Sequence, residues 1–108
     1  MSFDHSGRIA FITGAGSGIG RATALRLASQ GAAVVCAGVE QAAEEETARL
    51  ILERGGRAIA LTLDVSDEQA VQRTIATTLE GFGRLDVLVN NAGVGALPWD
   101  RTIAVNLS

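Results

Sequence analysis

Short runs of apolar, often β-branched residues alternate along the chain with longer segments in which apolar residues recur at helical spacing. The short runs predict four strands, at residues 9–13, 34–37, 58–63 and 87–89. The longer segments predict helices from the glycine-rich stretch to about residue 30, from about 41 to 54, from 66 to about 82, and onward from Pro98. Strands that are apolar throughout and alternate with helices are typical of a parallel sheet covered on both faces. The pattern therefore predicts one doubly wound α/β domain over residues 1–108, with no internal boundary.

Polar positions refine two of these helices. Ser66, followed by Gln69 three residues later, has the spacing of a capping box and predicts the start of the third helix. In the second helix, the acidic run Glu44–Glu46 is expected to form a solvated face. Glu45 and Arg49 are spaced for an ion pair across one helical turn.

The glycine-rich stretch from Thr13 to Gly20 lies where the first predicted strand leads into the first helix. In its pattern, T-G-x-x-x-G-x-G, Gly14 can form the tight turn, Gly18 lets a pyrophosphate approach the backbone, and Gly20 lets the helix pack closely on the strand. The helix N-terminus presents free N–H groups and a partial positive charge to an anion. Glycine clusters also form ordinary loops, but the strand–turn–helix context favours phosphate binding.

Two further motifs directly follow predicted strands. Leu63-Asp64-Val65 comes after the third strand, and Asn90-Asn91-Ala92-Gly93 after the fourth. Together with the glycine-rich stretch, they resemble the short-chain dehydrogenase/reductase family over nearly the whole chain. The resemblance implies a Rossmann-like sheet of four strands in the order 3-2-1-4. It also implies an NAD(P)-dependent oxidoreductase that transfers hydride between the nicotinamide and a carbonyl or alcohol.

The same resemblance assigns roles to individual residues. Asp64 and Val65 would meet the adenine, where a carboxylate can accept a hydrogen bond from the exocyclic amine; alternatively, Asp64 is an acid near the start of the next helix. Asn106 falls at the position of the family's catalytic asparagine. The pyrophosphate and the neighbouring ribose would be contacted by Gly14, Ser17, Gly18, Ile19 and Gly20. A loop beside the cofactor, or else simply a turn of residues that tolerate left-handed backbone, would consist of Asn90, Asn91, Ala92 and Gly93.

The sequence departs from the family where NAD is usually distinguished from NADP. An acid for the ribose 2′-hydroxyl, or an arginine for a 2′-phosphate, is expected at the end of the second strand, where Gly38 stands as a candidate cofactor contact. Glu40 lies two residues later and could reach the ribose, where it would repel a phosphate. Equally, Glu40 is an acid at the N-terminus of a helix. The sequence predicts NAD(P) as cofactor, with a preference for NAD.

The amino-acid composition limits the kinds of partner and site that the chain can have. The chain has 108 residues, a formal net charge of −3 and nine basic residues, all arginine and scattered along the chain, which is not the footprint of a nucleic-acid-binding protein. No apolar stretch has the length of a membrane span and no targeting segment is recognisable, so a cytoplasmic location is expected. Cys36 is expected to be a small buried hydrophobe, and His5 has no neighbours for a metal site.

Tyrosine and lysine are both absent from the chain. In the family, a serine and a Tyr-x-x-x-Lys pair that moves the substrate proton lie beyond the asparagine position. The resemblance therefore implies that this chain is a truncated, cofactor-binding portion that is inactive or nearly so alone. A small carbonyl or alcohol substrate would be handled only in a full-length parent.

Two alternatives remain open. In the absence of a fifth strand, residues 87–89 would form an exposed apolar edge, which favours a homo-oligomer or a non-catalytic, self-associating nucleotide-binding module. A methyltransferase-type fold has a similar first turn that binds an adenosyl group without a pyrophosphate. The motif at residues 90–93 argues against that fold.

Overall fold

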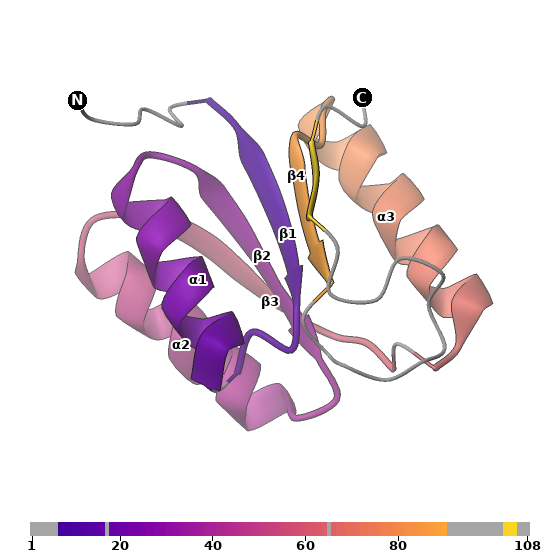
Figure 1. The fold of residues 1–108 in the computed structure, drawn as a ribbon, viewed down its shortest axis with the longest axis horizontal. Helices are drawn as coiled ribbons and strands as arrows, with labels where there is room; N and C mark the ends of the chain where they lie inside the picture. The colour runs from indigo at the N-terminus through magenta and orange to yellow at the C-terminus, as the bar shows by residue number, and fades with distance from the viewer. Residues whose placement is uncertain (1–6, 17, 65, 91–102, 106–108) are drawn as a thin grey trace.

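A computed structural model describes residues 7–16, 18–64, 66–90 and 103–105 (Figure 1). The elements run in the order β1 (Ile9–Thr13), α1 (Gly18–Ser29), β2 (Ala33–Gly38), α2 (Gln41–Glu53), β3 (Arg57–Thr62), α3 (Glu68–Phe82), β4 (Val87–Asn90) and β5 (Ile103–Val105). The strands form one sheet in the order β3-β2-β1-β4-β5, in which β1 to β4 are parallel. The predicted doubly wound fold and the strand order 3-2-1-4 are confirmed.

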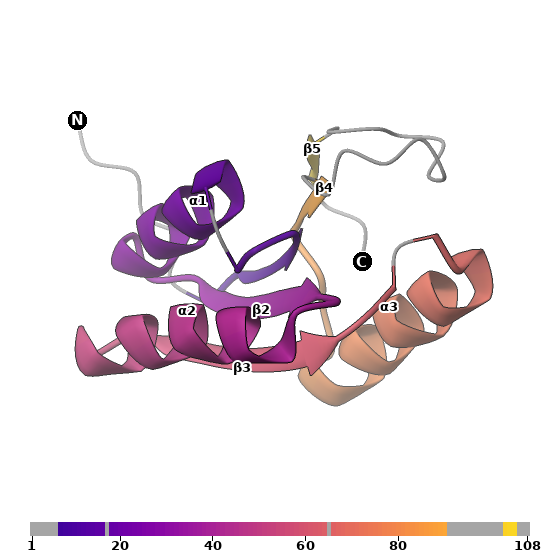
Figure 2. The same cartoon turned by 90° about the horizontal axis from the view of Figure 1, so that it is seen from below.

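Helices cover both faces of the sheet, with α1 and α2 on one side and α3 on the other (Figures 1 and 2). Neighbouring residues of β1 point into different layers. Ile12 packs in a cluster with Ala24 of α1 and Ile51 of α2, whereas Phe11 belongs to a second cluster with Val71 of α3. Every residue of β1 and β2 is buried. Burial on both faces explains why these strands are apolar throughout.

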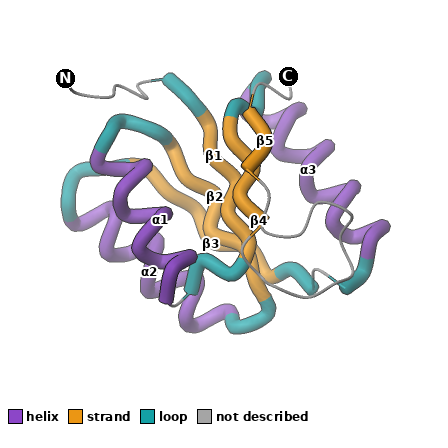
Figure 3. Tube along the Cα trace, in the orientation of Figure 1, coloured by secondary structure: helices purple, strands orange, loops and turns teal. Residues whose placement is uncertain are grey.

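The four parallel strands end at one edge of the sheet, where α1 begins (Figure 3). In the strand register, Thr13 of β1 pairs with Ala37 of β2 on one side and with Asn90 of β4 on the other. Gly38, the last residue of β2, pairs with Thr62, the last residue of β3. Ligands of open α/β sheets bind at the carboxyl ends of the strands, so this edge is where a site is expected.

The end of the chain differs from the sequence prediction. A helix was expected from Pro98 onward, but residues 103–105 form a strand that pairs antiparallel with β4, with Val87 opposite Val105. The expected exposed edge at residues 87–89 is therefore wrong, because β5 pairs with that side of β4. Ile103 and Val105 are β-branched, which suits a strand better than a helix. The proposed self-association through this edge loses its structural basis.

The cap of α3 also differs from the prediction. The N-cap is Asp67, whose carboxylate accepts a hydrogen bond from the Ala70 backbone N–H at 3.1 Å. Ser66 instead donates to Asp64 through both its backbone N–H and its hydroxyl, so the capping box predicted from Ser66 and Gln69 does not form. Ser66 and Asp67 are both suitable N-cap residues. Because the Ser66 hydroxyl is bonded to Asp64, Asp67 caps the helix.

At the amino-terminal edge of the sheet, a buried carboxylate joins the start of β1 to the residue that precedes β4. Asp86 is 1% exposed and accepts a hydrogen bond from the Ile9 backbone N–H at 2.9 Å, while its own N–H donates to the Ile9 carbonyl at 3.0 Å. The Arg84 guanidinium binds the same carboxylate. Hydrogen bonds from Arg84 hold the pKa of Asp86 below its ordinary value despite burial. The carboxylate is therefore ionised at neutral pH and fixes the register at the start of the sheet.

Candidate functional site

The glycine turn, residues Gly14–Gly16, connects β1 to α1 and is anchored to the neighbouring strand. Gly14 has a φ of 65° and donates its N–H to the Ala37 carbonyl at 2.8 Å. Gly18, the first residue of α1, has a φ of 57°. These are left-handed backbone conformations that favour glycine. A Cβ added to Gly18 would meet no atom within 4 Å, so the space beside this backbone is open.

The N-terminus of α1 carries no acidic side chain in its first turn. The free N–H groups and the partial positive charge of this helix end can therefore attract an anion, because no carboxylate in the first turn offsets them. Ile19 is 69% exposed, although it is one of the most apolar residues of the helix. Gly20 is buried against the rest of the fold. The turn and the helix start thus combine an anion-attracting backbone with an accessible apolar side chain.

Helix α2 holds the glycine turn from the other side. The Thr47 hydroxyl donates to the Ala15 carbonyl at 2.8 Å and accepts a hydrogen bond from Nε of Arg21 at 2.9 Å. Nη2 of Arg21 donates to the Ala43 carbonyl at 3.3 Å. This network joins α1, α2 and the turn. The Arg21 guanidinium takes part in it by donating hydrogen bonds to α2.

The expectation of a solvated face over Glu44–Glu46 is wrong at Glu44. Its side chain is only 3% exposed, and its carboxylate lies between the glycine turn and the end of β2. A Cβ added to Gly38 would lie 2.0 Å from Oε1 of Glu44, and one added to Gly16 would lie 2.3 Å from Oε2. The burial follows the apolar stripe of α2, because the other buried residues of that helix are spaced at helical intervals from Glu44. They are Thr47, Ala48 and Ile51.

Burial dominates the electrostatics of Glu44. It raises the pKa of the carboxyl group, and the charge of Glu40 adds to this effect. The backbone of Gly16 and the positive charge of Arg21 act in the opposite direction and lower the pKa. Within the described residues, Oε2 of Glu44 is a buried oxygen with no hydrogen-bond partner. Buried polar atoms without partners are uncommon and indicate a functional or structural cause.

The other acidic residues of α2 lie in solvent. Glu40 occupies the N-cap position of α2 but makes no capping hydrogen bond with its side chain. Arg49 pairs with Glu46 at 2.6 Å and with Glu53, instead of with Glu45 as predicted. Glu45 accepts a hydrogen bond from Gln41. The spacing allowed several pairs, and the rotamer of Arg49 selects two of them.

Two further ionisable side chains, Asp64 and Cys36, have pKa values shifted away from their ordinary values. Asp64 follows β3, is exposed, and accepts both hydrogen bonds from Ser66 at Oδ1, at 2.9 and 2.6 Å. These bonds lower its pKa, so the carboxylate is ionised at neutral pH. Cys36 is fully buried and free, and burial, followed by the charge of Glu44, raises its pKa to about 12. The prediction of a small buried residue at this cysteine is confirmed.

The structure brings part of the predicted set together at the carboxyl edge. Gly14, Gly18, Ile19 and Gly20 lie in or after the turn, and Gly38, Asp64 and Asn90 lie at or after the ends of β2, β3 and β4. The remaining candidates lie outside the described residues: Ser17, Val65, Asn91, Ala92, Gly93 and Asn106. Glu44 is the buried group at this edge that the sequence prediction missed.

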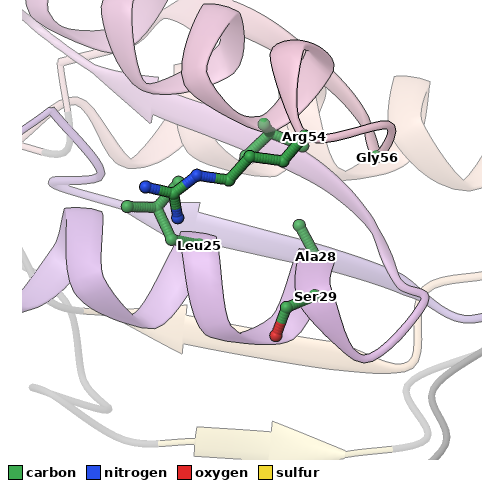
Figure 4. A pocket seen from close by; sticks show the side chains of 6 residues that line it. Leu25, Ala28, Ser29, Arg54 and Gly56 are labelled. Carbon is green, nitrogen blue, oxygen red and sulfur yellow. The ribbon is translucent and has the colours of Figure 1, made fainter.

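A hollow lies between the C-terminal ends of α1 and α2, away from the carboxyl edge of the sheet (Figure 4). Its lining residues are Leu25, Ala28, Ser29, Ile51, Arg54 and Gly56. The Arg54 side chain extends over Leu25, and the Ser29 hydroxyl already donates to the Arg26 carbonyl. The lining therefore offers few polar side chains that could bind a ligand or take part in a reaction. Within the described residues, no helix is long and apolar enough to cross a membrane, and no cluster of potential metal ligands occurs.

Comparison with known proteins places these features in a family context. The sequence model of a family described as short chain dehydrogenase matches residues 8–108. The chain is 43% identical over 118 residues to the short chain dehydrogenase/reductase astE of Aspergillus oryzae, covering 99% of this chain and 45% of that protein. It is 43% identical over 109 residues to the (2S)-[(R)-hydroxy(phenyl)methyl]succinyl-CoA dehydrogenase subunit BbsD of Thauera aromatica, covering 93% and 44%. The chain spans less than half the length of these relatives.

Solved structures share the backbone as well. A hydroxysteroid dehydrogenase from Escherichia coli matches with a TM-score of 0.79 at 37% identity, over 85% of this chain and 39% of that chain. A metagenomic short-chain oxidoreductase, solved in complex with NADP, matches with a TM-score of 0.80 at 42% identity, over 83% and 41%.

Proposed function

The chain belongs to the short-chain dehydrogenase/reductase family, and from that premise we propose that its glycine turn and strand ends bind a nicotinamide dinucleotide, with NAD preferred to NADP. The observation that carries the proposal is the pair of positive-φ glycines, Gly14 and Gly18, before and at the start of a 12-residue helix. A helix N-terminus reached through such a turn attracts phosphate groups. The similar oxidoreductase solved with NADP supports a dinucleotide as the ligand.

The described candidates suit this ligand. The open space beside Gly18 would admit the pyrophosphate, and the exposed Ile19 would cover an apolar part of the ligand. Asp64 is an ionised acceptor after β3, which suits the exocyclic amine of the adenine. Gly20, Gly38 and Asn90 are assigned to the same surface. On the family resemblance, Ser17, Val65, Asn91, Ala92 and Gly93 complete the cofactor contacts, and Asn106 is the catalytic asparagine.

The reaction itself needs more than this chain supplies. A bound nicotinamide would give or accept a hydride. The chain contains neither tyrosine nor lysine, so it does not carry the Tyr-x-x-x-Lys pair that moves the substrate proton in the family. We therefore propose that the 108 residues bind the dinucleotide without appreciable turnover, and that carbonyl or alcohol chemistry belongs to a longer protein containing them.

Titration calorimetry with NADH tests the proposed binding, using the wild-type chain and Gly18→Ala. Alanine at a φ of 57° is strained, and Gly55→Ala is the matched control, because Gly55 has a φ of 84° and equally open surroundings but lies after the C-terminal end of α2. We expect Gly18→Ala to weaken NADH binding at least about tenfold through loss of the phosphate approach. Gly55→Ala should keep the wild-type affinity. Absence of NADH binding by the wild type, or an equal loss in both variants, would overturn the proposal.

A further inference from the structure

The glycine at the end of β2 is required by a side chain of α2. Oε1 of Glu44 lies 2.0 Å from the position of a Cβ on Gly38, so the carboxylate fills the volume that a side chain at this position would occupy. Oε2 lies 2.3 Å from the position of a Cβ on Gly16. Two glycines from different segments therefore make the space for one carboxylate. The missing acid at the end of β2 is replaced in space by an acid from the next helix.

The carboxylate is poorly satisfied by the protein alone. Glu44 is 3% exposed, and its Oε2 has no hydrogen-bond partner within the described residues. A buried acceptor in this condition is destabilising, so the position of Glu44 is not explained by stability alone. Arg21, whose positive charge acts on Glu44, already donates to Thr47 and to the Ala43 carbonyl. The site thus lacks a donor at one carboxylate oxygen and lies beside the turn proposed to bind the pyrophosphate.

Resting on the proposed dinucleotide binding, we propose that Glu44 is the carboxylate that binds the 2′-hydroxyl of the adenosine ribose and so selects NAD over NADP. The hydroxyl donates to the carboxylate of Glu44, which occupies the volume that the side chain of an acid at position 38 would fill. A 2′-phosphate offers no such donor and brings negative charge against a buried carboxylate, in surroundings where charge repulsion is strong. The ribose therefore meets the same chemistry that an acid at position 38 would provide.

Glu40 is the competing candidate, because it is closer to β2 in the sequence. Its side chain is exposed, and Glu40 forms no capping hydrogen bond at the N-terminus of α2. An exposed carboxylate is screened by water and discriminates weakly between the two cofactors. Glu44 is held in place by packing against two glycines, so its position is fixed before the ligand arrives.

The test measures affinities for NAD⁺, NADP⁺ and the NAD⁺ analogue whose adenosine ribose lacks the 2′-hydroxyl. Calorimetry is carried out on the wild type, on Glu44→Gln, which removes the charge, and on Glu44→Met, which also removes the acceptor. Glu40→Gln tests the competing candidate, and Glu45→Gln is the matched control on the exposed side of the same helix. Circular dichroism confirms that each variant is folded.

We expect the wild type to bind NAD⁺ at least about tenfold more tightly than NADP⁺ and more tightly than the deoxy analogue, as for a hydrogen bond to a charged group. Glu44→Gln should abolish most of the preference over NADP⁺, and Glu44→Met should bind NAD⁺ and its analogue equally. Glu40→Gln and Glu45→Gln should leave both ratios unchanged. A purely structural role for Glu44 would alter folding but not these ratios.

Three results would overturn the assignment. They are equal wild-type affinities for NAD⁺ and the deoxy analogue, unchanged ratios in both Glu44 variants, and a shift confined to Glu40→Gln. The first needs no variant, so the assignment is tested even if the Glu44 variants do not fold. Failure of the wild type to bind any dinucleotide would refute the proposed function itself, whereas binding without these ratios would refute only the role of Glu44.

Discussion

Replacement of Gly38 by alanine should destabilise the chain only while Glu44 is present. The added Cβ would lie 2.0 Å from Oε1 and 2.7 Å from Cδ of Glu44, well inside van der Waals contact. The third-nearest atom, at 3.4 Å, belongs to the same side chain. Overpacking of this kind costs about 1–3 kcal/mol. With Glu44→Ala the clash disappears, and Gly38→Ala should be neutral or slightly stabilising, because alanine restricts the unfolded chain more than glycine does.

A double-mutant cycle measures this dependence. Urea unfolding of the wild type, both single variants and the double variant, followed by far-ultraviolet circular dichroism, gives the four free energies of unfolding. The coupling between the two positions should be at least about 1 kcal/mol. Gly16→Ala is the internal comparison, because its Cβ would also lie 2.6 Å from Cβ of Ala43 and should stay destabilising without Glu44. If the effects of Gly38→Ala and Glu44→Ala add to within about 0.5 kcal/mol, the packing of Glu44 against Gly38 is refuted.

Two further predictions concern ionisable groups inside the fold. Hydrogen bonds from Arg84 lower the pKa of Asp86, so its stabilising contribution is present above the ordinary aspartate pKa and is lost as the pH falls through the lowered value. Asp86→Asn should lose about 1.5–3 kcal/mol at neutral pH and flatten that acid limb in urea unfolding, and an unchanged acid limb would contradict this role. Cys36, with its pKa raised to about 12, should resist iodoacetamide in the folded chain at about pH 8 and react once urea unfolds it. Mass spectrometry counts the adducts, and rapid labelling of the folded chain would contradict the burial.

The sequence predicted the features that depend on local pattern and on parallel-strand topology. Strands β1 and β2 are recognisable because burial on both faces demands continuous apolar runs. The glycine turn is recognisable because left-handed backbone at Gly14 and Gly18 restricts the residue type. Since the carboxyl ends of parallel strands share one edge, Asp64 and Asn90 could be assigned to the same edge without knowledge of side-chain positions.

Features that depend on a choice between equivalent partners were not predictable in this way. Ser66 and Asp67 are both good caps, and only the geometry of the loop assigns the cap of α3 to Asp67. Arg49 had acidic residues at several suitable spacings, and its rotamer chose Glu46 and Glu53. The pairing of β5 with β4 brings together residues that are distant in the sequence, and local pattern carries little information about such a contact.

Gly38 and Glu44 belong to different elements but pack together, and the role of each residue is clear only when both are considered. In the sequence, the glycine indicates a missing carboxylate and the glutamate indicates a solvated helix face; in the fold, the carboxylate occupies the space that the glycine leaves open. Restoring an acid at the strand end by Gly38→Asp would therefore place a second carboxylate on the first and would not reproduce the usual family arrangement. The charge repulsion and the overlap would have to be removed together by also replacing Glu44 with a small residue. An acid can therefore be placed at the end of β2 only if Glu44 is replaced at the same time.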